Sequence, residues 1–362
     1  MYFEEHFSAI TDPRCKPRTI HLLTDIIGLS IIGTIAGCES YDDIEDFGHE
    51  KQDWLRKYLQ LPNGIPSHDT IQRLFETIDP KEFNACFTEW VQQTFSLSDE
   101  QMLHIDGKSN KRSADKYRGQ KMLHAVNVFA GTHHLSLAQL KVKEKSNEIN
   151  AIAPILNTLD IKDKVVTIDA MCCHKEIATA ITDKQGHYIL AVKDNQKSLH
   201  EAIQSAFQST PIEDTHKTIE KGHGRIEERS CSIISDLRFV DESVNWTALC
   251  CIIMVVSQRT IEDKTAIETR YYISSMENNA AFFLQAIRSH WGIENRLHWV
   301  LDVLFKEDYC RKRKENAAEN FNLIRKMALN FIRSYKGDKK SLRRRRLNAA
   351  WDDNYLGKIL GF

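Results

Sequence analysis

The chain has 362 residues, and its 49 basic and 50 acidic side chains give a formal net charge of -1. This length exceeds that of a single hydrophobic core and predicts two to three packed units, while 42% hydrophobic and 27% charged residues exclude a disordered or fibrous protein. Because the chain as a whole is not basic, any contact with nucleic acid has to come from local patches of positive charge.

Residues 1–98 are expected to form a small all-α domain. The stretch from Ile26 to Gly37 is apolar and nearly continuous, but it is shorter than the roughly 20 residues that span a bilayer, so we interpret it as a buried helix. Aromatic and leucine residues recur at helical spacing farther along. The segment LPNGIPSHDT interrupts these helices, and Ser67 or Asp69 could cap the helix that follows.

From Met102 onward the pattern changes to short runs rich in β-branched and apolar residues. MLHID, LHAVNVFAG and HLSLAQLKV predict three successive strands, with a hairpin turn at Gly131 to His133. EINAIAPILNTLD predicts a helix, VVTIDA a buried strand, HKEIATAITDK a helix and HYILAVK a strand. The order β-β-β-α-β-α-β predicts an α/β fold with a ribonuclease-H-like mixed sheet and flanking helices.

Residues 210–275 depart from this alternation. CSIISDLRFV, TALCCIIMVV and ETRYYISS predict strands without long intervening helices, and we interpret them as a β-rich insertion. Two long amphipathic helices are predicted after it, one ending near Lys306 and one over ENAAENFNLIRKMALNFIRSY. We therefore expect the ribonuclease-H-like domain to cover 99–335 and a basic segment to cover 336–362.

Two acidic residues directly follow apolar runs of this predicted core. Asp106 ends the first strand and Asp169 ends the fourth. Aspartate is depleted in strands and is seldom buried without a partner, so an acid at the tip of two core strands calls for an explanation. In a ribonuclease-H-like order the two strands are neighbours, which would bring the carboxylates together. For either acid taken alone, a turn or cap residue is the alternative interpretation.

A third acid is predicted from the first of the late helices. Five residues follow alternating steps of four and three, which predicts one stripe that faces the core. The stripe consists of Ile287, Trp291, Glu294, His298 and Leu301. A carboxylate in such a stripe suggests a ligand role for Glu294, although Asp302, two turns later on the same face, is an alternative.

Three convergent carboxylates would form a site for divalent metal. Asp106, Asp169 and Glu294 offer the hard oxygen ligands that Mg²⁺ or Mn²⁺ prefers. Two such ions, about 3.5 to 4 Å apart, would activate an attacking hydroxyl and stabilise the leaving oxygen of a displacement at phosphorus. In this hypothesis Asp106 bridges the two ions, and the other two acids each complete one ion's site.

Several ordered strings carry a family resemblance: DIEDFG, NGIPSHDTIQRLF, HIDGKSNKR, TIDAM, AVKDNQ, HGRIEER, RYYISS and HWGIENRLHWVLDVLFKED. They resemble DDE transposases of the bacterial ISAs-type insertion-sequence group, which includes the H-repeat-associated proteins of Rhs elements. The resemblance covers nearly the whole chain. It implies a ribonuclease-H-like domain with a magnesium-dependent triad of Asp106 in IDGK, Asp169 in IDAM and Glu294 in WGIEN, and it favours Glu294 over Asp302.

The activity that this resemblance implies is metal-dependent DNA cleavage and strand transfer at insertion-sequence ends. Double-stranded DNA, both element end and target, would be the partner, and pairing of two ends implies a homo-oligomer on DNA. A DNA-binding relic without catalysis and a nuclease without strand transfer are the alternatives. The chain departs from the family's Tyr, Arg, Glu, Lys signature at Ile287 and His290, and His290 would replace an arginine that contacts a DNA phosphate.

Basic and polar side chains near these motifs are candidates for DNA contact. The loop after Asp106 carries Lys116 and Arg118 as well as three of the candidates below, with one acid, Asp115; phosphate neutralisation and a solvated hairpin loop are both open. For the run KKSLRRRR, DNA contact and a disordered tail are open. His223, Arg225 and Arg229 could contact DNA or belong to a packed strand. The candidates for DNA binding are Lys108, Lys111, Arg112, Lys193, Asn195, His290, Arg296 and His298.

Other motifs are rejected. A phosphate-binding loop around Lys108 would need a glycine where Met102 stands. Cys172, Cys173 and His174 have poor spacing for zinc, and the nine cysteines include no C-x-x-C motif, so we interpret them as reduced thiols. The start, MYFEEHFSAI, does not resemble a secretory signal. A cytoplasmic, nucleoid-associated protein without a membrane partner is expected.

Overall fold

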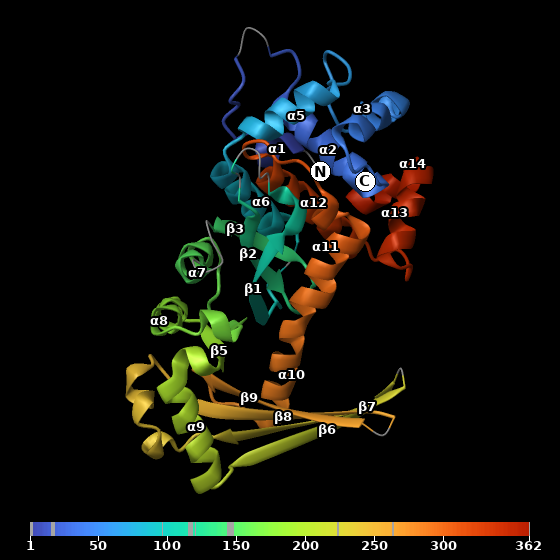
Figure 1. Cartoon of the computed structure of the whole chain (residues 1–362). Helices are drawn as coiled ribbons and strands as arrows, with labels where there is room; N and C mark the ends of the chain where they lie inside the picture. The colour runs from blue at the N-terminus through green and yellow to red at the C-terminus, as the bar shows by residue number, and fades with distance from the viewer. Residues whose placement is uncertain are drawn as a thin grey trace. The chain divides into compact units, whose positions relative to one another are not determined.

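The chain folds into two compact units in the computed structural model, which describes residues 3–15, 19–95, 97–114, 119, 121–142, 148–222, 224–262 and 264–361 (Figure 1). Unit 1 combines Met1–Asp99, Gly107–Lys145 and Asn295–Phe362, and unit 2 combines Glu100–Asp106 and Ser146–Glu294. The predicted domains 1–98, 99–335 and 336–362 are continuous stretches of sequence, whereas each compact unit is built from separated stretches.

The N-terminal part of unit 1 is helical, as predicted. Its helices are α1 Phe3–Phe7, α2 Leu23–Ala36, α3 Tyr41–Glu50, α4 Gln52–Leu55, α5 His68–Thr77 and α6 Pro80–Thr94. Helix α2 is the predicted apolar helix, and it is buried along nearly its whole length. It ends at Gly37, whose φ of 116° is left-handed and suits glycine. Within the described residues no single helix is long and apolar enough to cross a membrane.

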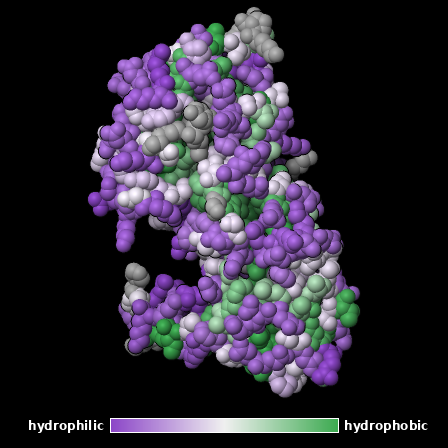
Figure 2. Space-filling view, turned by 180° about the vertical axis from the view of Figure 1, so that it is seen from behind, coloured by the Kyte–Doolittle hydropathy of each residue, from purple (hydrophilic) through white to green (hydrophobic). Residues whose placement is uncertain are grey.

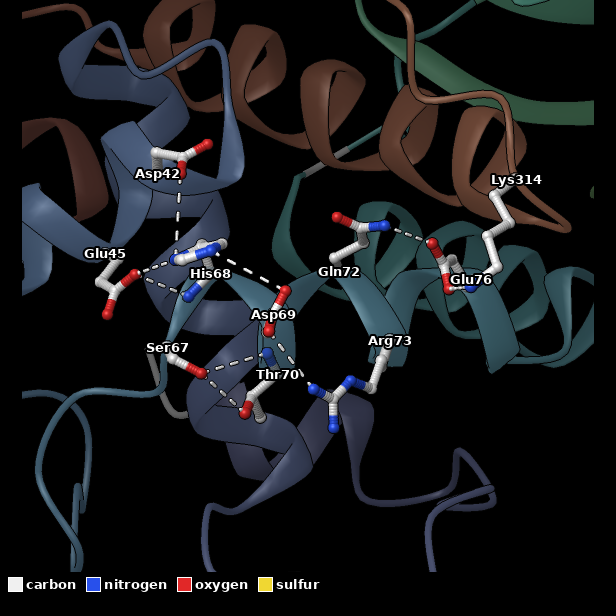
Figure 3. Close-up of polar contacts among 10 residues, drawn as sticks. All are labelled: Asp42, Glu45, Ser67, His68, Asp69, Thr70, Gln72, Arg73, Glu76 and Lys314. Carbon is white, nitrogen blue, oxygen red and sulfur yellow. Dashed lines mark hydrogen bonds and ion pairs between the residues drawn. The ribbon is translucent and has the colours of Figure 1, made fainter. Parts of the chain in front are cut away.

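Helix α5 begins with the cap that the sequence predicts. The Ser67 hydroxyl accepts a hydrogen bond from the Thr70 backbone N–H (Figure 3). This bond satisfies one of the backbone N–H groups in the first turn that have no carbonyl partner within the helix. One residue later, the His68 ring lies 2.6 Å from a Glu45 carboxylate oxygen on α3. These contacts fix the start of α5 against α3.

The later part of unit 1 packs around one central helix. Unit 1 also contains β2 Leu123–Ala130, β3 Ser136–Val142, α11 Trp299–Leu304, α12 Ala317–Ser334, α13 Leu342–Trp351 and α14 Asp353–Leu360. Helix α12 is buried on nearly all sides, and its buried polar residues bond to other elements. Asn320 donates to the carbonyl oxygens of Phe75 and Ile78, and Asn330 exchanges two hydrogen bonds with the Ser136 backbone.

The basic C-terminal segment is folded. The interpretation of this segment as a disordered tail is therefore wrong for the described residues 336–361. Helix α13 begins at the Ser341 cap and packs against α2 and α14. The Arg345 side chain is buried, with 8% exposure, and donates to an Asp338 carboxylate oxygen at 3.1 Å and to the Ile332 carbonyl at 2.8 Å.

The protein is a mixed α/β fold, and hydrogen bonds link its nine described strands in the order β3-β2-β1-β4-β5-β9-β8-β7-β6. Strand β1 covers Met102–Asn110, β4 Val165–Ile168 and β5 His187–Val192. β1 pairs in parallel with β4, and β4 pairs in parallel with β5. The predicted adjacency of the first and fourth strands is therefore confirmed.

Four more strands of unit 2 lie in the region predicted as a β-rich insertion. They are β6 Asp214–Gly222, β7 Arg225–Ile234, β8 Cys251–Ile261 and β9 Lys264–Ser274. All pair antiparallel with their neighbours, and β9 also pairs with β5, so they extend the β1-β4-β5 sheet. The sequence missed β6, whose residues are mostly polar, and predicted strand for Leu237–Phe239, which is a 3-10 turn.

The helices of unit 2 are α7 Glu148–Asn157, α8 Lys175–Asp183, α9 Lys197–Ser209 and α10 Ala280–Gly292. Helices α7 and α8 pack against each other, and Figure 1 shows them in adjacent positions. Helix α10 packs on β6 and β7, where Phe283, Leu284 and Ile287 enter a core with Ile253 and Tyr272. On the face shown in Figure 2, hydrophilic residues predominate and apolar residues lie in small groups, as is usual for a protein surface.

Candidate metal-binding site

Asp106 and Asp169 lie where the pairing of two adjacent parallel strands ends. The last registered pair of β1 and β4 is Ile105 with Ile168, so each aspartate is the residue that follows this pair in the chain. β1 continues to Asn110, and the prediction that Asp106 ends this strand is wrong, because only the partner strand stops there. Asp169 instead begins a 3-10 turn and accepts a weak bond from the Cys172 N–H at 3.4 Å.

Glu294 lies in a π-helix, Ile293–His298, which directly follows α10. A carboxylate oxygen of Glu294 lies within 4.8 Å of one of Asp106. The predicted inward stripe is only partly correct. Ile287, His298 and Leu301 are buried, whereas Trp291 is 50% exposed and Glu294 is exposed. A π-helical turn holds an extra residue, so the 3.6-residue spacing no longer decides which positions face inward.

A cavity of about 630 Å³ in unit 2 is lined by all three predicted acids. The environment of Cys172 reflects the proximity of Asp106 and Asp169: burial raises the pKa of its thiol, and the negative charges of Asp169, Glu148 and Asp106 raise it further. Burial and Asp169 likewise raise the pKa of Cys173 to about 12. Both cysteines are therefore protonated thiols at neutral pH in this structure.

Glu148 is a further acid beside the turn that follows Asp169, and the sequence did not single it out. It is buried, with 4% exposure, at the start of α7. Its Oε2 accepts a hydrogen bond from the Cys172 thiol, with Sγ 3.5 Å away. The only signal in the sequence was an acid in front of an apolar helix, which also occurs at ordinary helix N-termini.

His290 also lines the cavity, and two strands fix its ring. Its Nδ1 lies 2.8 Å from the Thr167 hydroxyl on β4, which in turn lies 2.6 Å from Nδ1 of His104 on β1. His104 and Thr167 are buried, with 0% and 2% exposure. The His290 ring is therefore held through residues that lie two positions before Asp106 and Asp169.

Lys193 and Asn195 follow β5 and line the same cavity. The Lys193 side chain is exposed. The Asn195 amide donates to the Ala170 carbonyl at 2.7 Å, and the Gln196 amide donates to the Cys173 carbonyl at 2.9 Å. These two bonds hold the turn that follows Asp169, so Asn195 already has a positioning role within unit 2.

The predicted DNA contacts after Asp106 carry ion pairs within unit 1. Lys108 is largely buried, and its Nζ lies 2.5 Å from Asp302 and 2.6 Å from Glu307. Burial lowers the pKa of Lys108, but the two carboxylates outweigh it, so the net shift is upward. Asp302, the alternative third acid, is thus the partner of a lysine. A phosphate could reach Lys108 only if these ion pairs opened.

The two other candidates in this segment, Lys111 and Arg112, also contact side chains of unit 1. Lys111 pairs with Asp308 at 3.1 Å, and the Arg112 guanidinium stacks over the Tyr309 ring at 4.7 Å. These two pairs lie at the surface, where charged side chains exchange partners readily. Asp115, Lys116 and Arg118, predicted for the same loop, lie outside the described residues.

The remaining candidates differ in accessibility. Arg296 is exposed, with Nη1 2.5 Å from His134, whereas His298, one turn after Glu294 in the π-helix, is only 2% exposed. Arg225 and Arg229 both form ion pairs with Glu227 on β7. His223 lies outside the described residues.

Comparison with known proteins identifies the family. The model described as "DDE_Tnp_1-associated" matches residues 4–91, and the model described as "Transposase DDE domain" matches residues 77–331. The latter range covers more than half of the chain. The chain belongs to the DDE transposase family.

This DDE transposase is close to the H-repeat proteins of bacteria. It is 42% identical to "H repeat-associated putative transposase YhhI" of Escherichia coli (strain K12), over 98% of this chain and 97% of that protein. The same values hold for "Putative protein YbfL" of that organism. "Inactive transposase YbfQ", also from that strain, is 46% identical over 83% of its own length, which is 19% of this chain.

Proposed function

We propose that this DDE transposase catalyses metal-dependent cleavage and strand transfer of DNA at the ends of an insertion sequence. The observation that carries the proposal is the approach of the Asp106 and Glu294 carboxylates to within 4.8 Å, at a cavity that Asp169 also lines. Asp169 lies 63 positions after Asp106 in the chain, and Glu294 lies 188 positions after it. The convergence of the three acids is therefore a property of the fold and not of local sequence.

We further infer that the β1-β4-β5 part of the sheet is a ribonuclease-H-like core. The parallel pairing of β1 with β4 and of β4 with β5 supports this inference. So does the placement of α8 between β4 and β5, since a parallel pair needs a crossover connection. The antiparallel β2–β3 hairpin adds the remaining predicted strands.

The donor set suits divalent cations. Two carboxylates this close repel each other unless a proton or a cation offsets their charge, and oxygen ligands at the edge of an open cavity are what Mg²⁺ or Mn²⁺ takes while keeping waters and phosphate oxygens. When bound, two such ions would supply Lewis-acid stabilisation of the charge that develops at phosphorus. Asp106, Asp169 and Glu294 would be the residues that hold these ions.

Other residues of the cavity would bind and orient the DNA. The exposed Lys193 ammonium offers a point charge for a phosphate oxygen. The His290 ring, held through Nδ1 by Thr167, lines the same cavity. Asn195 keeps the turn after Asp169 in place through the Ala170 carbonyl. Together these groups would position a scissile phosphate next to the three acids.

The test combines cleavage with metal binding. The full-length protein is incubated with candidate element-end DNA and Mg²⁺, and Asp169→Asn is compared with Asp183→Asn, which removes the same charge from an exposed position at the end of α8. We expect cleavage and joining by the wild type and by Asp183→Asn, and neither by Asp169→Asn. Cleavage without joining would indicate a nuclease, and DNA binding alone would indicate a non-catalytic relic.

A second readout does not depend on activity. Calorimetric titration of the DNA-free protein with Mn²⁺ should show binding that Asp169→Asn and Glu294→Gln weaken and Asp183→Asn leaves unchanged. Equal Mn²⁺ affinity in all four proteins would remove the metal-ligand assignment. Because transposition joins paired ends, we also propose that the protein acts as a homo-oligomer on DNA, which sedimentation of the complex with end DNA would reveal.

A further inference from the structure

The basic run at the C-terminus is the densest positive segment of the chain that the site does not use. Residues 336–346 contain seven lysines and arginines and one acid, Asp338. For a chain with a net charge of -1, this is a strong local concentration of positive charge. The structure divides the seven cations into two groups with different surroundings.

The first group holds the C-terminal helices in place. Arg345 is buried and bonds to Asp338 and to the Ile332 carbonyl. Arg346 donates to the Thr34 carbonyl at 3.1 Å and stacks over the Phe305 ring at 4.4 Å. Lys340 lies over the Tyr355 ring at 4.8 Å. These three cations are part of the packing and are not available to a partner.

The second group faces solvent. It consists of Lys336, Lys339, Arg343 and Arg344, all exposed. In the ranges that the structure describes, none of these four side chains forms an ion pair or a hydrogen bond. Asp338, the acid within the run, accepts bonds from Arg345, from the Tyr355 hydroxyl at 2.6 Å and from the Lys340 N–H at 2.9 Å. The one nearby negative charge of the run is therefore already used by the first group.

The contrast with the loop after Asp106 indicates a function. There, Lys108 and Lys111 are matched by acids of the same unit, whereas the four outer cations of the C-terminal run are not. Arg343 and Arg344 lie on α13, and Lys336 and Lys339 shortly precede it. Cations held close together repel one another, and binding of a polyanion relieves this repulsion. Arginine guanidinium groups in particular suit phosphate oxygens, which they can bind bidentately.

We propose that Lys336, Lys339, Arg343 and Arg344 form a docking surface for the phosphate backbone of double-stranded DNA, distinct from the residues proposed to cut it. The inference rests on the proposed function for the choice of DNA among polyanions. The contact is made to the backbone alone, so it is independent of sequence and depends strongly on salt, since each neutralised phosphate releases counterions.

The test measures how DNA binding changes with salt. A fluorescent duplex of unrelated sequence is titrated with the full-length wild type, with Arg343→Gln/Arg344→Gln and with the control Arg56→Gln/Lys57→Gln. The control removes two exposed positive charges elsewhere in unit 1. Each lost phosphate contact lowers the slope of log affinity against log salt by about 1. We therefore expect the arginine variant to lose about 2 from the slope and the control to keep it.

The outcomes separate this inference from the proposed function. Equal slopes in all three proteins, or an equal loss in the control, would overturn the docking surface even if the wild type cleaves element ends with Mg²⁺. A slope loss confined to the arginine variant supports the surface even if no protein cleaves. Loss of binding to duplex RNA or to vesicles with anionic lipid, with the DNA slope unchanged, would also overturn it. Unchanged thermal unfolding of the arginine variant, expected because both side chains are exposed, excludes misfolding as the cause.

Discussion

The hydroxyl of Thr167 lies 2.8 Å from Nδ1 of His290. The same hydroxyl lies 2.6 Å from Nδ1 of His104, and the two imidazole rings meet edge to face with centroids 5.8 Å apart. His104 and Thr167 each precede a proposed metal ligand by two residues in their strands. The strands that lead to Asp106 and Asp169 therefore also set the orientation of the His290 ring.

Removal of this hydroxyl should impair the reaction more than the fold. Thr167→Val keeps the shape of the side chain but removes the hydroxyl that contacts Nδ1 of His290, and loss of an orienting contact behind a functional group costs about 10- to 100-fold in activity. We expect single-turnover cleavage of end DNA to fall about 10-fold. Thr167→Ser, which keeps the hydroxyl, should recover most of the rate.

A purely structural role of Thr167 would give a different pattern. In that case Thr167→Val would lower the thermal unfolding temperature and the amount of active protein, and the rate per active molecule would stay at the wild-type value. Active-site titration in parallel with unfolding curves distinguishes the two. A wild-type rate per active molecule in Thr167→Val would refute the positioning role.

The choice of Glu294 over Asp302 as third acid can be tested by matched amide substitutions. Glu294→Gln and Asp106→Asn should abolish cleavage while end-DNA affinity is retained, because each removes a charge proposed to hold metal. Asp302→Asn should cleave at a rate near that of the wild type, since Asp302 pairs with Lys108. Substantial cleavage by Glu294→Gln, or its loss in Asp302→Asn, would reverse the assignment.

The sequence predicted the two aspartates of the site because their positions depend on local sequence pattern. Asp106 and Asp169 follow apolar runs, and the pairing of β1 with β4 then follows from the order of elements. The capped start of α5 at Ser67 was predictable for the same reason, because capping is chemistry within one turn. The family resemblance, and not spacing, favoured Glu294 over Asp302.

The parts that were missed depend on register and on distant partners. The π-helix at Ile293–His298 changes which residues of the late helix face inward, and a fixed 3.6-residue period cannot anticipate it. Lys108 looked like a free cation in a loop, but its acidic partner Asp302 is 194 residues away. Glu148 gave no distinctive signal because an acid is ordinary at a helix start.

The two lysines predicted as DNA contacts after Asp106 should differ sharply in their effect on stability. Lys108→Met leaves Glu307, whose side chain is 1% exposed, without its nearest cation, and breaking a buried pair costs about 3–5 kcal/mol of unfolding free energy. Lys111→Met removes a lysine that is 78% exposed and should leave stability unchanged within error. Urea unfolding of both variants measures the difference. Equal midpoints would show that Glu307 finds another partner or takes up a proton.

Lys326 should make stability depend on pH in the alkaline range. It is buried in α12, where its Nζ donates to the side-chain oxygens of Asn127 and Gln139. Burial lowers the pKa of Lys326 from 10.5 to about 7, against the opposing effect of Glu307. Between these two values the unfolded chain binds one proton more than the folded chain at this residue, so its contribution to folding becomes more favourable as pH rises.

The comparison with Lys326→Met isolates this contribution. The Met side chain does not titrate, so the unfolding free energy of the variant relative to the wild type should be most favourable at or below pH 7. It should then decline steadily as pH rises from 7 to 10, by urea unfolding at matched pH values. Lys57→Met, at an exposed position, serves as control and should differ from the wild type by a constant amount. A constant difference for Lys326→Met as well would mean that Lys326 keeps its proton in the fold, held by Glu307.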